Sequence, residues 1–140
     1  FLKIRSIKNV GIIFKNEGIK KMINALKNKS YLGLASDQNA GKSGLEVDLL
    51  NIKISIPKGA AIFHIKTKSP IIIGYCIMNK NKTYDFNVKL LDTSNIDLEK
   101  DDAIYRINRK FAKSLGEMIK KYPNQYFWFH KMKKKSEYNK

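Results

Sequence analysis

The sequence predicts an α/β fold: a mixed, largely parallel sheet flanked by helices and incomplete at its N-terminus. Residues 11–35 follow the order strand, helix, strand, which forms a parallel pair with a right-handed crossover. Residues 71–78 form a continuous apolar run typical of a buried strand, and residues 101–121 repeat apolar side chains at helical spacing. The first residue is Phe1 and the chain begins in the middle of a pattern, so the sequence is expected to be a fragment.

The strand–helix–strand unit is predicted at residues 11–14, 17–27 and 31–35. Asn16 can cap the helix, and Glu17 places an acid in the first turn, where the helix dipole favours it. One face of this helix is expected in the core, because its apolar residues recur at intervals of three and four: Ile19, Met22, Ile23 and Leu26.

The middle of the chain is divided by turn and breaker residues. Residues 45–56 are rich in Val, Leu and Ile and separate around Asn51 into two short extended pieces. Pro57 suits the first turn of a helix, and Ser69 with Pro70 ends that helix.

A hairpin is predicted next, because the polar turn 79–83 joins the apolar run 71–78 to residues 84–91. In residues 84–91 apolar and polar side chains alternate, as in a half-exposed strand. Residues 1–130 are expected to belong to a single domain, and residues 131–140 to form a basic tail.

Composition limits the classes of function. The chain has 140 residues and is 43% hydrophobic, which fits a globular domain with a real core. Its net charge of +16 predicts an anionic partner, although compositional drift towards Lys accounts for such an excess equally well. The single cysteine, Cys76, excludes an internal disulfide and a cysteine-rich zinc site. No segment approaches the roughly 18 to 20 apolar residues that span a bilayer, so membrane association is expected to be peripheral unless an upstream part carries an anchor.

The most informative stretch is the loop after residues 31–35. Its sequence Ala40-Gly41-Lys42-Ser43 imitates the end of a phosphate-binding loop, but Ser36 stands where that motif needs its first glycine. The following residues are also extended, whereas the motif requires a helix there. Asp37 remains: an acid directly after an apolar strand indicates a site, and equally a turn in which Asp binds its own loop.

Metal and nucleic-acid chemistry are both disfavoured. His64 and His130 have no HxxxH or CxxC spacing around them, so no metal site is predicted and a packed or surface histidine is the default. Aromatic residues at 126–129 could stack on bases, but their successive positions after a helix favour a core plug. A basic nucleic-acid-binding module is therefore kept only as an alternative from a different class of function, a binding module and not an enzyme.

Three stretches carry a family resemblance. They are LASDQNAGKSGLEVDLL at residues 34–50, SIPKGAA at 55–61 with KSPII at 68–72, and YPNQYFWFHKMK at 122–133. Together they resemble the bacterial lipid A biosynthesis acyltransferase family, the late lauroyl and myristoyl acyltransferases. The third is the most specific, being similar to the signature Tyr-Pro-Glu-Gln-Tyr-x-Trp-x-His-Arg-Arg-x-Lys.

This resemblance implies a glycerophosphate-acyltransferase-like fold. It implies transfer of a fatty acyl chain from acyl carrier protein to a hydroxyl of a lipid A precursor, in lipopolysaccharide biosynthesis, with no cofactor apart from that carrier-linked donor. The implied partners are acyl carrier protein and an anionic membrane lipid or lipid A precursor, and no nucleic acid. The implied location is the cytoplasmic face of the cell inner membrane, with an anchor upstream. A lysophospholipid or other glycolipid acyltransferase is the alternative.

The family's catalytic motif is not in this chain. The family uses a His-x4-Asp/Glu pair, in which the His is the general base for the acceptor hydroxyl. Here His64 is followed at the corresponding position by Ser69, and His130 by Lys135. The pair is therefore expected upstream of Phe1, and this chain alone is expected to be inactive.

The resemblance assigns supporting roles to four residues. By position, Arg5 matches the family's Arg and Asp37 its Asp, so Arg5 is expected to bind a phosphate or developing negative charge, and Asp37 to hold that Arg or a substrate hydroxyl. Gln38 and Lys42 are expected to bind substrate. The sequence departs from the family at residues 48–51, where the usual Phe-Phe-Gly is replaced, and at 131–132, where Arg-Arg is replaced.

Overall fold

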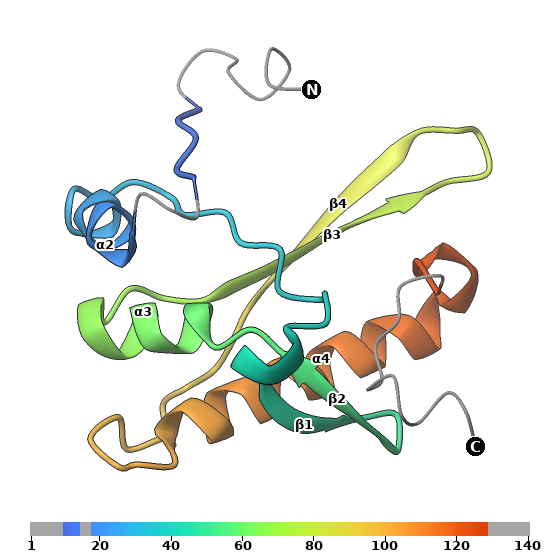
Figure 1. The fold of residues 1–140 in the computed structure, drawn as a ribbon. Helices are drawn as coiled ribbons and strands as arrows, with labels where there is room; N and C mark the ends of the chain where they lie inside the picture. Colours follow the sequence, from blue (N-terminus) through green and yellow to red (C-terminus); the bar gives the residue numbers. More distant parts are fainter. Residues whose placement is uncertain (1–9, 15–17, 129–140) are drawn as a thin grey trace. The chain divides into compact units, whose positions relative to one another are not determined.

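The computed structural model describes residues 10–14 and 18–128, which belong to two compact units, Phe1–Gly33 and Leu34–Lys140 (Figure 1). The described part of the first unit contains helix α2, Ile19–Lys27. This helix confirms the one predicted at residues 17–27, although it starts later, after Gly18 at φ 87°. The expected core face is not formed in the described residues, because none of the helix residues is buried and Ile19 is 54% exposed. The proposed cap, Asn16, lies outside the described residues.

The predicted strands at residues 11–14 and 31–35 are not formed in the described chain. Tyr31 is 96% exposed, and the boundary between the two units falls inside the second run. A strand needs a neighbouring strand that binds its backbone, and neither run belongs to a sheet in the described residues. Both sheets of the described residues are antiparallel pairs, so the expectation of a largely parallel sheet is corrected, while the α/β class holds.

The two extended pieces predicted around Asn51 are both strands, and the structure pairs them as a β-hairpin, which was not predicted. Strands β1, Leu45–Leu49, and β2, Ile52–Ile56, pair with Val47 opposite Ile54. Leu50 and Asn51 join them at φ 51° and 67°, the left-handed conformation of tight hairpin turns.

The elements that follow also confirm the predicted order. Helix α3, Gly59–Thr67, ends at Lys68 in the left-handed conformation. Strands β3, Ile72–Met78, and β4, Tyr84–Leu90, form the second antiparallel hairpin. Helix α4 spans Ala103–Lys121 and leads into the short 3-10 helix η3, Pro123–Gln125.

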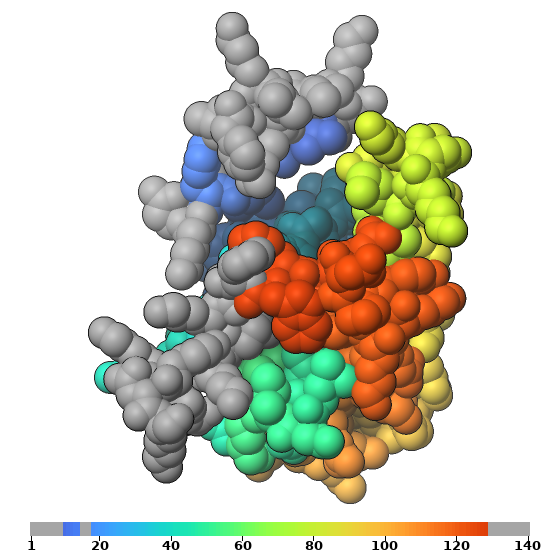
Figure 2. All heavy atoms as spheres, turned by 90° about the vertical axis from the view of Figure 1, so that its right-hand side faces the viewer, coloured from blue at the N-terminus to red at the C-terminus, as the bar shows by residue number. Residues whose placement is uncertain are grey.

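Helix α4 is the central element of the second unit. The core of this unit consists of two hydrophobic clusters, and buried residues of α4 belong to both. Ala112, Leu115 and Ile119 pack with the β1–β2 hairpin. Ala103 and Ile107 pack with residues of α3 and of the segment after β4. Figure 2 shows the end of α4 and η3 in orange-red beside the green β1–β2 hairpin. None of the helices in the described residues has both the length and the apolar character needed to cross a bilayer.

Candidate functional site

The loop from Ser36 to Gly44 is the candidate site, and its second half is fixed to strand β2. The Ala40 N–H donates to the Ser55 carbonyl at 3.0 Å, and the Ser55 hydroxyl donates back to the Gly41 carbonyl at 2.6 Å. Ser55 is itself buried in β2. Because both bonds connect the loop to a strand of the core, the loop is held in one position on the hairpin.

Two glycines allow this close approach. A Cβ on Gly44 would lie 2.2 Å from the Ser55 Oγ and 2.8 Å from the Ile56 carbonyl oxygen, so no other residue fits without displacing backbone. Gly41 stands at φ 58°, a conformation that favours glycine, and its N–H donates to the Asn39 Oδ1 at 2.8 Å. The two glycines are therefore required by the tight turn that leads into strand β1. This structural reason explains them without a phosphate-binding loop.

The predicted site residues of this loop are exposed. Asp37 and Gln38 precede the fixed half, and Lys42 lies in the 3-10 helix η2, Gly41–Ser43. Of the three, Lys42 has an exposed side chain on the fixed backbone, which suits binding of a substrate from solvent or from a membrane surface. Arg5 lies outside the described residues, so its pairing with Asp37 stays a prediction.

The structure brings Asp37 near the C-terminal aromatic segment, which sequence reasoning did not anticipate. Burial is the main cause that raises the pKa of the Tyr126 phenol, and the negative charge of Asp37 raises it further. Tyr126 packs against the hydrophobic cluster of β1, β2 and α4. Its ring meets Trp128 edge to face, with centroids 5.1 Å apart. Asp37 therefore lies within electrostatic range of Tyr126, which belongs to another stretch of the family resemblance.

His64 has a structural role, as the default interpretation expected. It is buried, and its Nδ1 lies 2.7 Å from the Ser69 carbonyl oxygen. A carbonyl only accepts, so Nδ1 carries the proton, and Nε2 pairs with the Thr93 hydroxyl at 3.1 Å. His130 falls outside the described part of the chain. Within that part, no group of three or more His, Cys, Asp or Glu side chains lies close enough to hold a metal ion.

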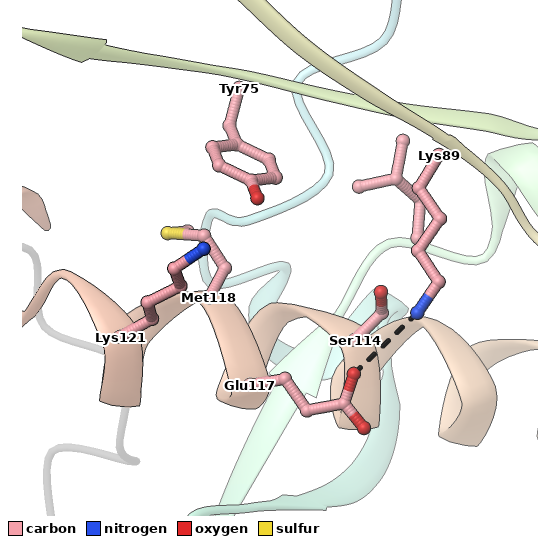
Figure 3. Close-up of a pocket in the computed structure, with 7 residues that line it drawn as sticks. Tyr75, Lys89, Ser114, Glu117, Met118 and Lys121 are labelled. Carbon is pink, nitrogen blue, oxygen red and sulfur yellow. Dashed lines mark ion pairs between the residues drawn. The ribbon is translucent and has the colours of Figure 1, made fainter.

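A small hollow lies elsewhere, between the β3–β4 hairpin and α4 (Figure 3). Its volume is about 130 Å³, whereas ligand pockets usually enclose roughly 300–1,000 Å³. Across it the Lys89 Nζ and the Glu117 Oε2 form an ion pair at 3.6 Å. None of the predicted site residues that the structure describes lines it, so it is a packing feature. Its lining consists of Ile73, Tyr75, Lys89, Ser114, Glu117, Met118 and Lys121.

Sequence reasoning missed Ser55 and gave Tyr126 no role. The signal for Ser55 was a small hydroxyl residue within the apolar strand, at a position where alternation would place an exposed polar side chain beside Lys53. The signal for Tyr126 was its place in the most specific stretch of the resemblance.

Comparison with known proteins identifies the family. The family described as bacterial lipid A biosynthesis acyltransferase matches residues 1–135. No curated protein matches the chain. Because the family match covers nearly the whole chain, including the Asp37 loop and the aromatic segment, the chain belongs to the bacterial lipid A biosynthesis acyltransferase family.

Proposed function

We propose that this chain is the C-terminal portion of an acyltransferase that moves a fatty acyl chain from acyl carrier protein to a hydroxyl of a lipid A precursor. The observation that carries the proposal is the family match over residues 1–135. The loop that presents Asp37 supports it, because an exposed carboxylate directly before the segment fixed to β2 can orient a cationic or hydroxyl partner.

Each loop residue has a role within this reaction. The acceptor hydroxyl attacks the thioester carbonyl and gives its proton to a general base, for which the proposal relies on a His-x4-Asp/Glu pair outside residues 1–140. The new ester C–O bond forms as the thioester C–S bond breaks, and the thiol of acyl carrier protein leaves with the proton that the base has taken. Asp37 holds Arg5 or a substrate hydroxyl, and Arg5 stabilises negative charge. Lys42 binds an acceptor phosphate and Gln38 donates an amide hydrogen bond to the acceptor. The proposal includes no metal or organic cofactor.

The charge of the chain suits this setting. A net charge of +16 attracts acidic acyl carrier protein, lipid phosphates and the anionic inner surface of a membrane. We therefore place the reaction at the cytoplasmic face of the inner membrane. Acylation of a lysophospholipid or another glycolipid is the alternative, and it would use the same loop with a different acceptor.

The test uses the purified chain with labelled acyl–acyl carrier protein and two acceptors, a phosphorylated acylated glucosamine lipid and a lysophospholipid. We expect no transfer to either, because the general base is missing; clear turnover would overturn the proposal that this chain is inactive alone. Calorimetry with a soluble glucosamine phosphate should then show several-fold weaker binding for Lys42→Gln and unchanged binding for Lys113→Gln, a control on the exposed side of α4. A gel-shift with nucleic acid and no lipid-phosphate binding would favour the nucleic-acid module.

A further inference from the structure

The aromatic segment after α4 does not form the core plug that its sequence favours. Tyr126 packs against the cluster of β1, β2 and α4, but Phe127 is 69% exposed and Trp128 is 56% exposed. A single exposed ring is ordinary on a protein surface. The Trp128 ring differs from an ordinary one because it is also held in place.

Three contacts within its own segment hold Trp128. Its Nε1–H donates to the Pro123 carbonyl oxygen at 2.5 Å, and its backbone N–H donates to the Tyr126 carbonyl oxygen at 3.0 Å. The Tyr126 ring meets the indole edge to face, with the two ring centroids 5.1 Å apart. Because Pro123 lies in η3 and Tyr126 packs against the core, the indole is anchored to the folded unit.

These contacts determine which part of the indole remains exposed. The Nε1–H is the only polar group of the side chain, and the bond to Pro123 uses it internally. The exposed side-chain surface is therefore mainly aromatic carbon, whose π face carries partial negative charge. Such a face attracts the weakly positive C–H groups of a ligand and offers no hydrogen bond that the ligand must match.

The surroundings of the ring are polar and charged. The segment after Asp37 is bonded to Ser55 of β2, and Tyr126 packs against the cluster that contains β2, so both belong to the same part of the unit. Burial and then the negative charge of Asp37 raise the pKa of the Tyr126 phenol, so Asp37 lies within electrostatic range of the ring that supports the indole. Asp37 and Gln38 are both exposed.

This combination limits what can cover the ring. A purely apolar cover, whether an acyl chain or more protein core, would remove water from the Asp37 carboxylate without replacing its hydrogen bonds, which is strongly unfavourable. A nucleic-acid strand stacks bases on aromatic rings, but its phosphates pass every base and would bring repeated negative charge towards Asp37. The ligand that fits has an apolar face and hydrogen-bonding groups at its rim.

A pyranose ring has both features. Its faces present C–H groups and its rim carries hydroxyl groups, so it can stack on an indole while a carboxylate and an amide bind the rim. The glycerol backbone of a lysophospholipid is an open chain without such a face. The arrangement therefore distinguishes between the two classes of acceptor lipid.

We propose that the exposed face of Trp128 is the platform on which a sugar ring of the acceptor lipid stacks, with Asp37 and Gln38 binding hydroxyls at the rim of that ring. The choice of a sugar rests on the proposed function, which gives a glucosamine lipid as the acceptor. Trp128 is then a binding residue that favours this acceptor over a lysophospholipid.

The chain reports on this contact directly, because Trp128 is its only tryptophan. Glucosamine phosphate added to the purified chain at millimolar concentration should shift the indole emission and lower its collisional quenching by acrylamide. Glycerol phosphate at the same concentration should do neither, because it carries a phosphate without a ring.

Substitutions locate the contact. Trp128→Leu keeps an apolar side chain but removes the aromatic face, and should weaken calorimetric binding of glucosamine phosphate roughly fivefold. Trp128→Phe keeps an aromatic face and should recover part of the lost affinity. The matched control is Tyr105→Leu, an exposed aromatic residue on α4, which should bind as the native chain does.

Four results would overturn the platform. An indole that is shielded from acrylamide before any ligand is added would mean that another part of the polypeptide covers the ring. An accessible indole without any response to glucosamine phosphate would exclude the sugar. An equal response to glycerol phosphate would show that only the phosphate is bound. A stronger response to adenosine monophosphate than to glucosamine phosphate would assign the ring to a base.

The platform and the proposed function fail separately. In the full product of the reading frame, Trp128→Leu should raise the KM for the glucosamine lipid about fivefold with a much smaller effect on kcat, because stacking holds substrate and transition state alike. Acyl transfer with an unchanged KM would reject the platform and keep the enzyme. Sugar binding at Trp128 without acyl transfer would keep the platform and reject the enzyme.

Discussion

The side-chain amide of Gln125 closes a pair of hydrogen bonds with the backbone of Met78. The Met78 N–H donates to the Gln125 Oε1 at 2.8 Å, and the Gln125 Nε2 donates to the Met78 carbonyl at 2.9 Å. A strand end normally gives these two groups to a neighbouring strand or to water. Gln125, from the segment after α4, therefore ties the far end of β3 to the C-terminal part of the unit.

Replacing Gln125 should loosen this connection. Gln125→Ala removes both bonds and should lower the free energy of unfolding by about 1 kcal/mol, because the groups are partly reached by water. Gln125→Glu keeps the acceptor and loses the donor, so its carboxylate would face the Met78 carbonyl and should not rescue the loss. Urea denaturation measures both, with Asn124→Ala as the neighbouring exposed control. Equal midpoints for Gln125→Ala and Asn124→Ala would contradict a role for the pair.

Gly44 should be the least replaceable residue of the candidate loop. A Cβ there would overlap the Ser55 hydroxyl and approach the Ile56 carbonyl, so Gly44→Ala should cost about 2 kcal/mol of stability. Gly33→Ala, which meets nothing within 4 Å, should change stability by no more than about 0.5 kcal/mol.

A second substitution separates strain at Gly44 from general disruption. Ser55→Ala removes the nearest clashing atom but also the bond to the Gly41 carbonyl. The Gly44→Ala/Ser55→Ala double variant should therefore lose less than the sum of the single losses, as a thermodynamic cycle would report. Strict additivity would show that the two residues do not share the contact described.

His64 should contribute to stability and not to chemistry. His64→Leu keeps a side chain of moderate size but leaves the Ser69 carbonyl and the Thr93 hydroxyl without their partner, and should cost about 2 kcal/mol. Lys66→Ala, on the exposed side of α3, is the control and should change little. Thermal unfolding by circular dichroism is sufficient to distinguish them. If His64→Leu were as stable as the control, the buried hydrogen bonds would have no net value.

The closeness of Asp37 and Tyr126 should appear in the alkaline titration of Tyr126. Its pKa is raised above the ordinary value of 10.0, by burial first and by Asp37 second. Asp37→Asn should therefore lower this pKa part of the way, leaving the contribution of burial. NMR of the tyrosine ring signals measures the shift, and Asp101→Asn, an exposed acid in the turn before α4, should have no effect.

The same shift has a consequence for stability. Because the folded-state pKa of Tyr126 lies above the unfolded one, its contribution is fully present below the unfolded pKa and is lost as the pH rises through the folded pKa. Asp37→Asn should reduce the part of this alkaline loss that the carboxylate causes. An unchanged Tyr126 titration in Asp37→Asn would mean that the two residues do not interact.

Local patterns predicted much of this fold, and long-range pairing limited the rest. Helix α4 and the β3–β4 hairpin follow from periodicity and turn residues that are local in the sequence, as do the two extended pieces that become β1 and β2. Residues 31–35 have the composition of a strand, but whether they pair depends on strands elsewhere, and in the described residues they do not. In residues 84–91 the alternation predicted two faces correctly, but it could not tell which of them meets α4.

At the candidate site, too, the sequence predicted the local features but not the long-range ones. The loop, its exposed Asp37 and its glycines were predictable, because an abrupt change from apolar to small and polar residues is local. The bond from Ser55 to the Gly41 carbonyl and the electrostatic effect of Asp37 on Tyr126 join positions far apart in the chain, and the order of residues alone does not predict such long-range relationships.

The most direct measurement of the central claim is acyl transfer by the full product of the reading frame that encodes residues 1–140. Labelled acyl–acyl carrier protein and a phosphorylated acylated glucosamine lipid are the substrates. We predict transfer to the lipid hydroxyl, reduced roughly 100-fold by Asp37→Asn, which loses the orienting charge, and unchanged by Asp101→Asn. If the Asp37→Asn variant transferred the acyl chain at the wild-type rate, the proposed role of Asp37 would be contradicted. If a lysophospholipid were acylated in preference to the glucosamine lipid, the proposed acceptor would be contradicted.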